Sequence, residues 1–259
     1  MFDRETTQPP SREIDPDTWF ATVKRVARRT AGPVLLVWLA ISAAEFFVAE
    51  WMAGGMSNLR IGPWWDVPLD LRAWAMSPIA AGVLPLLAAF RTALFRPARQ
   101  VVDGESLGVR GAARGAFDRL VPVFSTRMSI GTALIAVLMF CSWLVVPMPI
   151  WVLLPLGFTL APALYLVAAK CMTPDDGIAS ALEISRHHWP AIFAAHGFGL
   201  IAILGFMTGG AAYGLYEPWP IFPLNTFGNL QILGAYLAGR YVDWIVVTGT
   251  YVYLESDAE

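Results

Sequence analysis

The stretch Ser129–Ala169, SIGTALIAVLMFCSWLVVPMPIWVLLPLGFTLAPALYLVAA, decides the fold class of this chain. It contains two apolar runs, Ser129–Val146 and Ile150–Ala169, which are separated only by a Pro-Met-Pro turn. A helix of about 20 mostly apolar residues crosses the bilayer core of about 30 Å. Each run has about that length and lacks charged residues, so the stretch predicts two membrane-spanning helices in a tight hairpin.

The rest of the chain repeats this pattern. Of its 259 residues, 56% are hydrophobic and 15% are charged, whereas a soluble domain has about 45–50% apolar and about 25% charged residues. Prolines inside some runs predict kinks, because neighbouring helices and water satisfy the freed carbonyl groups. The sequence therefore predicts an all-α membrane protein with about six spans. The four further runs are Val34–Met52, Trp74–Phe95, Ala191–Ala212 and Leu230–Leu254.

The distribution of Lys and Arg predicts the orientation of the spans. Six basic residues precede the first run and six lie between the second and third, but the first outer loop has only Arg60 and Arg72. Loops rich in Lys and Arg stay in the cytoplasm. The first 32 residues have no apolar core with a small-residue cleavage site, so no cleaved signal peptide is expected. We expect a bacterial inner-membrane protein with both termini in the cytoplasm.

An amphipathic stretch that ends near a proline precedes each pair of spans. These stretches are Asp15–Thr30, Ser106–Val121 and Asp176–Trp189, and Asp15 followed by Pro16 is typical of a helix N-cap and first turn. The repeated order predicts three units, each a cytoplasmic amphipathic surface helix followed by two spans. One membrane domain is therefore expected over residues 15–254, between a flexible tail at 1–14 and an acidic tail at 255–259.

Basic residues on two of these amphipathic stretches indicate contact with membrane lipids. Helices with Lys and Arg on the polar face lie in the headgroup region, where anionic lipid attracts each basic residue by roughly 1 kcal/mol. Two interpretations stay open: the helices only orient the spans, or they form a dedicated lipid-sensing surface. The residues are Lys24, Arg25, Arg28, Arg29, Arg110 and Arg114.

Charged residues inside the predicted spans form the main candidate site. Arg240 and Asp243 are three residues apart and share a helix face, and Glu45 lies midway along the first run. An ionisable group inside a bilayer costs at least about 2.5–3.5 kcal/mol, so it normally has a partner. We expect Glu45 within ion-pair reach of Arg240, as a carrier site or as a buried pair that fixes helix register. Arg91, nearer the cytoplasmic end of its run, is expected to extend to the interface.

Small residues in the fifth run predict close helix packing. Packing within the chain and a homodimer face both stay open, and the aromatic outer loops around Trp64 and Trp219 are a second surface for a protein partner. The small residues form two Gly-x-x-x-Gly spacings, Gly205 with Gly209 and Gly210 with Gly214.

No enzyme, cofactor or metal pattern is found. The sequence has no Gly-x-Ser-x-Gly elbow, His-Glu-x-x-His, phosphate loop or dinucleotide-binding glycine pattern. His188 and His196 lack a third metal ligand, and Cys141 and Cys171 have no zinc-site spacing. Nucleic-acid binding has no folded module to support it. We therefore expect a protein without catalytic activity, cofactor or bound metal.

Three segments resemble landmarks of a group of uncharacterised bacterial inner-membrane proteins. They are Gly104–Leu120 (GESLGVRGAARGAFDRL), Asp176–Trp189 (DGIASALEISRHHW) and Thr248–Glu255 (TGTYVYLE). That group is similar to the membrane domain found ahead of some glycerophosphodiester phosphodiesterases. The resemblance implies surface helices and span pairs from about Asp15 onward. It implies no activity, because the sequence contains no phosphodiesterase catalytic domain, and Glu255 begins an acidic end where the group has a basic run.

The sequence thus favours a non-catalytic membrane protein: an accessory or scaffold subunit, or a lipid-interacting factor of the cell envelope. The alternative is a small carrier whose site consists of Glu45, Arg240 and Asp243. A water-filled cavity around these three residues favours the carrier, whereas a dry and fully paired cluster favours a structural role.

Overall fold

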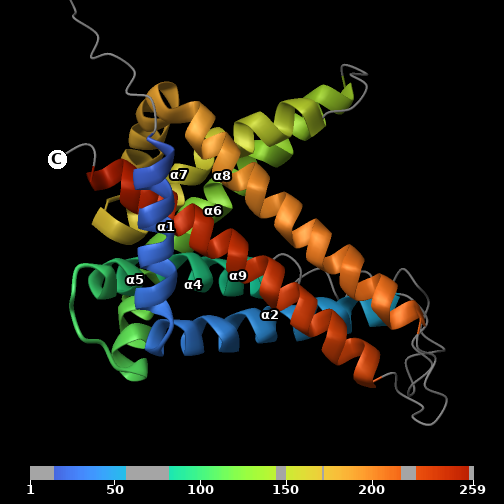
Figure 1. The fold of residues 1–259 in the computed structure, drawn as a ribbon. Helices are drawn as coiled ribbons and strands as arrows, with labels where there is room; N and C mark the ends of the chain where they lie inside the picture. The colour runs from blue at the N-terminus through green and yellow to red at the C-terminus, as the bar shows by residue number, and fades with distance from the viewer. Residues whose placement is uncertain (1–14, 57–81, 144–149, 171, 217–225, 257–259) are drawn as a thin grey trace, which may run out of the picture.

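The computed structural model describes residues 15–56, 82–143, 150–170, 172–216 and 226–256 (Figure 1). All regular secondary structure in these ranges is helical, which confirms the all-α class. The helices are α1 (Pro16–Thr30), α2 (Pro33–Met56), α4 (Leu84–Ala93), α5 (Phe95–Val102), α6 (Val109–Trp143), α7 (Ile150–Lys170), α8 (Pro174–Tyr216) and α9 (Thr226–Ser256).

Three segments, Val109–Phe140, Val152–Lys170 and Pro174–Phe206, are long and apolar enough to cross a membrane. A fourth results if α1 and α2, which are bent by 86° at their junction, are counted together. Many large apolar side chains on the outside are exposed, as lipid allows and water does not. The chain is therefore a helical membrane protein. The count of six spans stays a prediction, because residues 74–81 of the second run lie outside the described ranges.

The first amphipathic stretch forms a separate helix, α1, as predicted. Asp15 is its N-cap and accepts a hydrogen bond from the Asp17 amide, with proline in the first turn. Its apolar face packs on α9 instead of facing lipid: a Cβ on Gly249 would lie 2.8 Å from the Cα of Val23. Trp19 Nε1 also donates a hydrogen bond to Thr250 Oγ1 at 3.0 Å. Protein contacts thus hold α1 at its sharp angle to α2.

The second amphipathic stretch differs from the separate surface helix that was predicted. Helix α6 begins at Val109, three residues after the predicted start, and continues through Pro122 for 35 residues. A proline removes one backbone hydrogen bond, and packing on both sides of it keeps this helix continuous. The third stretch does form a distinct helix: it is the first part of α8, which ends at a kink with non-helical dihedral angles at His188 (φ −121°, ψ 21°), two residues before Pro190.

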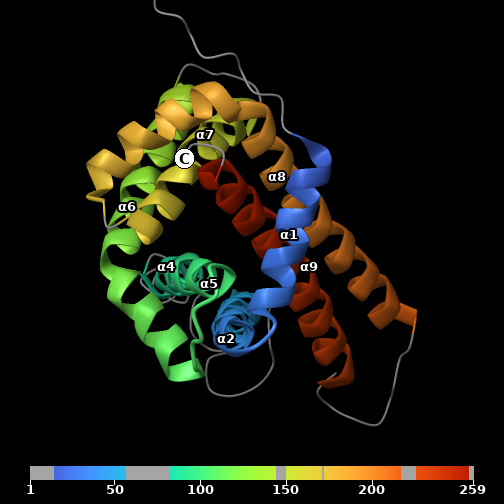
Figure 2. The ribbon, with the colours of Figure 1, turned by 60° about the vertical axis from the view of Figure 1, so that its left-hand side comes forward.

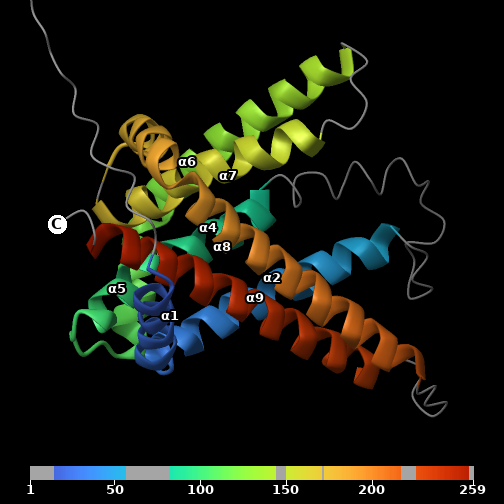
Figure 3. The same cartoon turned by 45° about the horizontal axis from the view of Figure 1, so that its top comes forward.

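The helices meet at one end of the molecule, which we call the base. It contains α5, the start of α6 and the last turns of α7 and α9, which are joined where Glu255 pairs with Arg99 and Lys170. Helices α8 and α9 run antiparallel and side by side, and the α6–α7 hairpin diverges from them away from the base (Figures 1 and 3). Figure 2 shows α4 and α5 enclosed between α6 and the α1–α2 corner.

Candidate functional site

Glu45 of α2 lies between two arginines from different helices. Its Oε2 pairs with Nη1 of Arg91 on α4, and its Oε1 lies 3.9 Å from Nη2 of Arg240 on α9. The exposed fractions of the three side chains are 10%, 11% and 29% in this order. The expected approach of Glu45 to Arg240 is therefore present at the outer limit of an ion pair, but Arg91 is the closer partner.

The prediction that Arg91 extends to the interface is wrong. Ala88, Ala89 and Ala93 are buried, so α4 lies among other helices and the guanidinium of Arg91 faces α2. Small side chains allow this close approach of helices. The sequence does contain a signal for the pairing: a buried carboxylate at Glu45 needs a cation, and Arg91 is the basic residue inside the neighbouring run.

Two more charged residues complete what we call the charged cluster: Glu45, Arg91, Arg127, Arg240 and Asp243. Arg127 of α6 interacts electrostatically with Arg91, Glu45 and Arg240, and Asp243 of α9 does so with Arg91 and Arg240. Neither Arg127 nor Asp243 forms an ion pair or hydrogen bond with any described residue. The cluster has three guanidinium groups and two carboxylates, so one positive charge is in excess.

Arg240 is only partly neutralised. Its guanidinium carbon lies 5.4 Å from the ring centre of Tyr236, in a cation–π contact on the same helix. Its Nε is buried and has no hydrogen-bond acceptor within the described ranges. Because arginine stays protonated in proteins, it retains an unused donor as well as its charge.

Further buried polar atoms without a partner lie on α2 and α9, the helices that carry Glu45 and Arg240. Four side-chain atoms on these helices lack a hydrogen-bond partner among the described residues: Trp38 Nε1, Ser42 Oγ, Trp244 Nε1 and Thr248 Oγ1. The rings of Trp38 and Trp244 lie 6.3 Å apart. An unsatisfied buried group costs about 1–3 kcal/mol, so four of them on two neighbouring helices are unusual for a purely structural interface.

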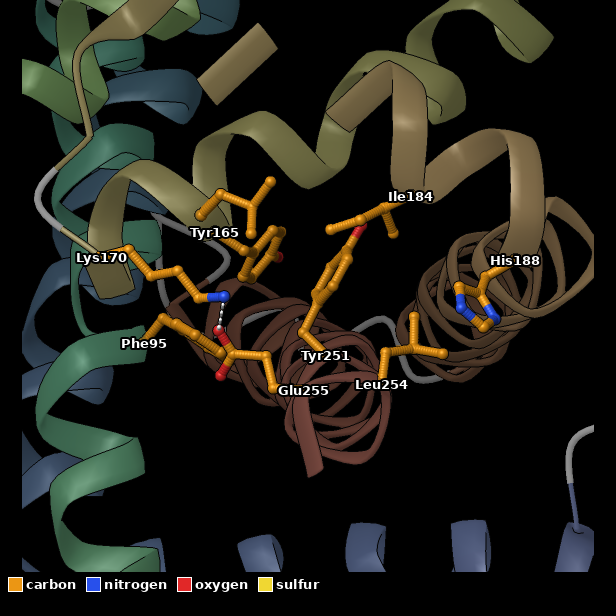
Figure 4. A pocket seen from close by; sticks show the side chains of 9 residues that line it. Phe95, Tyr165, Lys170, Ile184, His188, Tyr251, Leu254 and Glu255 are labelled. Carbon is orange, nitrogen blue, oxygen red and sulfur yellow. Dashed lines mark ion pairs between the residues drawn. The ribbon is translucent and has the colours of Figure 1, made fainter. Parts of the chain in front are cut away.

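A pocket of about 90 Å³ opens at the base, between α5, α7, α8 and α9 (Figure 4). Tyr165 and Tyr251 stack with their ring centres 4.3 Å apart, and Phe95 meets Tyr165 edge-on at 5.4 Å. At the rim, Lys170 Nζ lies 3.9 Å from Glu255 Oε1, the pair that Figure 4 marks with a dashed line. The pocket is thus an aromatic chamber with charged residues at its mouth.

Tyr165, which lines the pocket, interacts electrostatically with Asp243, Arg91 and Arg127 of the charged cluster. Phe95 follows Arg91 by one helical turn, and Tyr251 follows Asp243 by two, so the pocket lies on the base side of the cluster. Glu45, Arg240 and Asp243 themselves do not line it. Arg127 and Tyr165 were not predicted from the sequence. Arg127 lies in the basic link between the second and third apolar runs, and Tyr165 lies near the end of an apolar run, where aromatic residues are common at the membrane interface.

The predicted lipid-facing basic residues are all exposed: Lys24, Arg25, Arg28 and Arg29 on α1, and Arg110 and Arg114 on α6. The two helices differ in what lies beside these charges. On α6 the same face continues with Phe117 and Val121, which are 66% and 76% exposed. On α1 the apolar side chains Val23 and Val26 are buried against protein.

Close packing of α8 and α9 involves two glycines that were not predicted, while three of the four predicted glycines remain untested. A Cβ on Gly205 would meet nothing within 4 Å, and the side-chain surroundings of Gly209, Gly210 and Gly214 lie outside the described part of the chain. A Cβ on Gly239 would instead lie 2.9 Å from the Cα of Ile203, and one on Gly199 would collide with Asp243 Oδ1. Both contact glycines follow an alanine by four residues, a small-residue spacing that a search for Gly-x-x-x-Gly overlooks.

Metal binding finds no support in the described ranges, where no group of three His, Cys, Asp or Glu side chains is arranged to hold an ion. His196 instead contacts the Tyr251 hydroxyl through Nε2 at 3.2 Å and stacks on Phe158. Cys171 lies outside the described ranges, and the surroundings of Cys141 are likewise not described.

Comparisons of the chain with family models, with curated proteins and with solved structures find no match. The resemblance to the membrane domain ahead of some glycerophosphodiester phosphodiesterases therefore stays a prediction. The function of the chain has to be inferred from its own residues.

Proposed function

We propose that this protein is a non-catalytic accessory protein of the bacterial inner membrane that binds anionic lipid at the cytoplasmic leaflet. The observation that carries the proposal is the exposed face of α6, on which basic side chains near the start of the helix are followed by large apolar ones. The base then lies on the cytoplasmic side, as the excess of Lys and Arg there favours.

The spacing on α6 suits a helix that enters a bilayer through its headgroups. Arg110, Arg114, Phe117 and Val121 follow one another by four, three and four residues, so they lie on one stripe. From Arg110 to Val121 the helix rises about 16 Å. The guanidinium groups therefore reach lipid phosphates when the phenyl and valine side chains lie among acyl chains.

Helix α1 adds charge without inserting. Its four exposed basic residues lie on the polar face, while protein covers most of its apolar face. Such a helix attracts anionic lipid over about one Debye length and contributes little apolar burial. The two helices together support a lipid-binding surface in which α6 provides the specific contacts.

The test is binding of the purified full chain to phosphatidylglycerol in phosphatidylcholine nanodiscs, followed by native mass spectrometry at low salt. The double variant Arg110→Gln with Arg114→Gln removes roughly 1 kcal/mol of binding free energy per charge, so the affinity for phosphatidylglycerol should fall about 30-fold. The matched control is Arg110→Lys with Arg114→Lys, which keeps both charges and should retain most of the binding. Equal retention of phosphatidylglycerol by the Gln variant would show that α6 does not bind it.

A small carrier is the second candidate, and the observation that favours it is the electrostatic interaction of the charged cluster with Tyr165, which lines the pocket. Water access to the charged cluster can be tested at Ser42, which is fully buried and lies one helical turn from Glu45. In a background without native cysteines, Ser42→Cys should react with a small methanethiosulfonate in membranes if the cluster opens to water. Complete protection under native conditions would favour the purely structural role.

A further inference from the structure

We propose that the charged cluster binds one small monovalent anion, which reaches it from the base through the aromatic pocket. This goes beyond lipid binding, because the site lies inside the helix bundle and the exposed basic residues of α1 and α6 play no part in it. Binding of an anion also does not require that the protein transport it.

The charge of the cluster is the first argument. Arginine does not lose its proton in a protein, so the three guanidinium groups remain charged. Glu45 is shared by Arg91 and Arg240, and Asp243 rests against Gly199 of α8. Arg127, which is half-buried, forms no ion pair or hydrogen bond with any described residue. One negative charge next to Arg127 would balance the cluster.

The unpartnered polar atoms are the second and independent argument. Arg240 Nε, Trp38 Nε1 and Trp244 Nε1 are buried atoms that only donate, and the hydroxyls of Ser42 and Thr248 also donate. A cation or a metal ion needs acceptors, which are scarce among these atoms. Several buried donors with an excess positive charge fit an anionic acceptor.

The pocket supplies a route and limits the size of the ligand. At its mouth Lys170 pairs with Glu255, and beside the mouth Arg99 pairs with Glu255 and Asp103, so these charges balance and leave the entrance open to an anion. Behind the mouth, Figure 4 shows Phe95, Tyr165 and Tyr251 facing one another. A volume of about 90 Å³ holds about three water molecules. Chloride, nitrate or acetate fits this space.

The test uses the full chain in a neutral, lipid-free detergent. Nitrate, chloride and acetate are titrated by isothermal calorimetry at constant ionic strength, with gluconate as the oversized replacement anion. Tryptophan fluorescence provides a second readout, because the indoles of Trp38 and Trp244 border the cluster. We expect saturable binding to one site.

Two variants should shift the affinity in opposite directions. Arg127→Gln should weaken binding at least tenfold, because it removes the excess charge. Asp243→Asn should tighten binding several-fold, because it removes a competing carboxylate; a merely structural residue would not do this. Arg186→Gln makes the same change of charge on an exposed residue outside the cluster and should leave binding unchanged.

Absence of saturable binding in the wild type, or equal binding by Arg127→Gln, would overturn the proposal. If Arg127→Gln does not fold, the direction of the Asp243→Asn effect decides. Repeating the titration in phosphatidylglycerol and phosphatidylcholine nanodiscs separates the two sources of anion. If phosphatidylglycerol abolishes nitrate binding through Arg127, a lipid phosphate occupies the cluster and the small-anion proposal fails. The lipid test on Arg110 and Arg114 is independent of all these results.

Discussion

Helix α9 has two faces that differ in how they are packed. Toward α8 it is fitted backbone to backbone, with Gly239 against Ile203 and no room for a methyl group. Toward α2 it presents Arg240 and Trp244, each with a buried polar atom that has no partner among the described residues. The first face is what a membrane protein needs to hold two helices together. The second retains polar groups that a purely structural contact would not, and these groups border the charged cluster.

The largest expected effect comes from the charged side of this comparison. Arg91→Ala leaves Glu45 as a buried carboxylate whose remaining partner, Arg240, is 3.9 Å away. Loss of one member of a buried pair costs about 3–5 kcal/mol. We expect a correspondingly lower unfolding free energy in detergent, measured by chemical denaturation. The double variant Arg91→Ala with Glu45→Gln should recover part of this loss, and strictly additive losses would contradict the pairing.

Removing Arg240 should cost less than removing Arg91. Arg240→Ala deletes the more distant of the two partners of Glu45 and a partly exposed cation–π contact. We expect the free energy of unfolding to fall by about 1–3 kcal/mol, as it does when a partly desolvated charged group loses a hydrogen bond. Denaturation of the two single variants side by side tests the order. A larger loss for Arg240→Ala would mean that Arg240 and not Arg91 neutralises Glu45.

The tightly fitted side of α9 offers a prediction with a control on the same helix. Gly239→Ala brings a methyl group to 2.9 Å from a backbone atom of α8, so the two helices must separate. Overpacking of this kind costs about 1–3 kcal/mol. Gly234→Ala, where a Cβ meets nothing within 4 Å, should instead be neutral or stabilising because alanine favours the helix. Thermal unfolding of both variants measures the difference, and equal behaviour would remove the distinction between the two positions.

The smallest effect concerns the N-terminus of α1, which covers a third side of α9. Hydrogen bonds from the Thr18 hydroxyl and the Asp17 amide hold the pKa of Asp15 below its ordinary value. A lowered folded-state pKa stabilises the helix above the unfolded pKa of about 4, and this contribution is lost as the pH falls through the folded value. The protection factors of the α1 amides, which correct hydrogen exchange for its intrinsic pH dependence, should therefore fall at acid pH. Asp15→Ala should remove this pH dependence of the amide protection in α1. The same pH dependence in the variant would show that titration of Asp15 does not cause it.

Sequence alone predicted those features that depend on local chemistry or on the solvent. The apolar runs predicted membrane helices because lipid requires them, and Asp15 with Pro16 predicted the start of α1 because a cap needs only neighbouring backbone groups. The approach of Glu45 to Arg240 followed from charge balance inside a bilayer, with no knowledge of the packing.

Features that depend on which helices meet were not predictable in this way. Arg127 belongs to a basic link by count but lies in the middle of the continuous helix α6, where its charged neighbours come from α2, α4 and α9. Whether Pro122 ends a helix depends on the packing around it, and so does the choice of glycines between α8 and α9. These outcomes are set by tertiary contacts, which one sequence does not reveal.

The kink at His188 divides α8 into two parts, one packed on α7 and the other on α9. On one side of it, Ser185 donates a hydrogen bond to the Thr159 carbonyl and Gly177 lies against Val167, which fastens that part to α7. Beyond it, Gly199 and Ile203 fasten the helix to α9. Residue 188, where the part of α8 fixed to α7 meets the part fixed to α9, also lines the pocket. A change in the angle between these two parts of α8 would therefore change the shape of the pocket, and a ligand bound there would favour one angle over others.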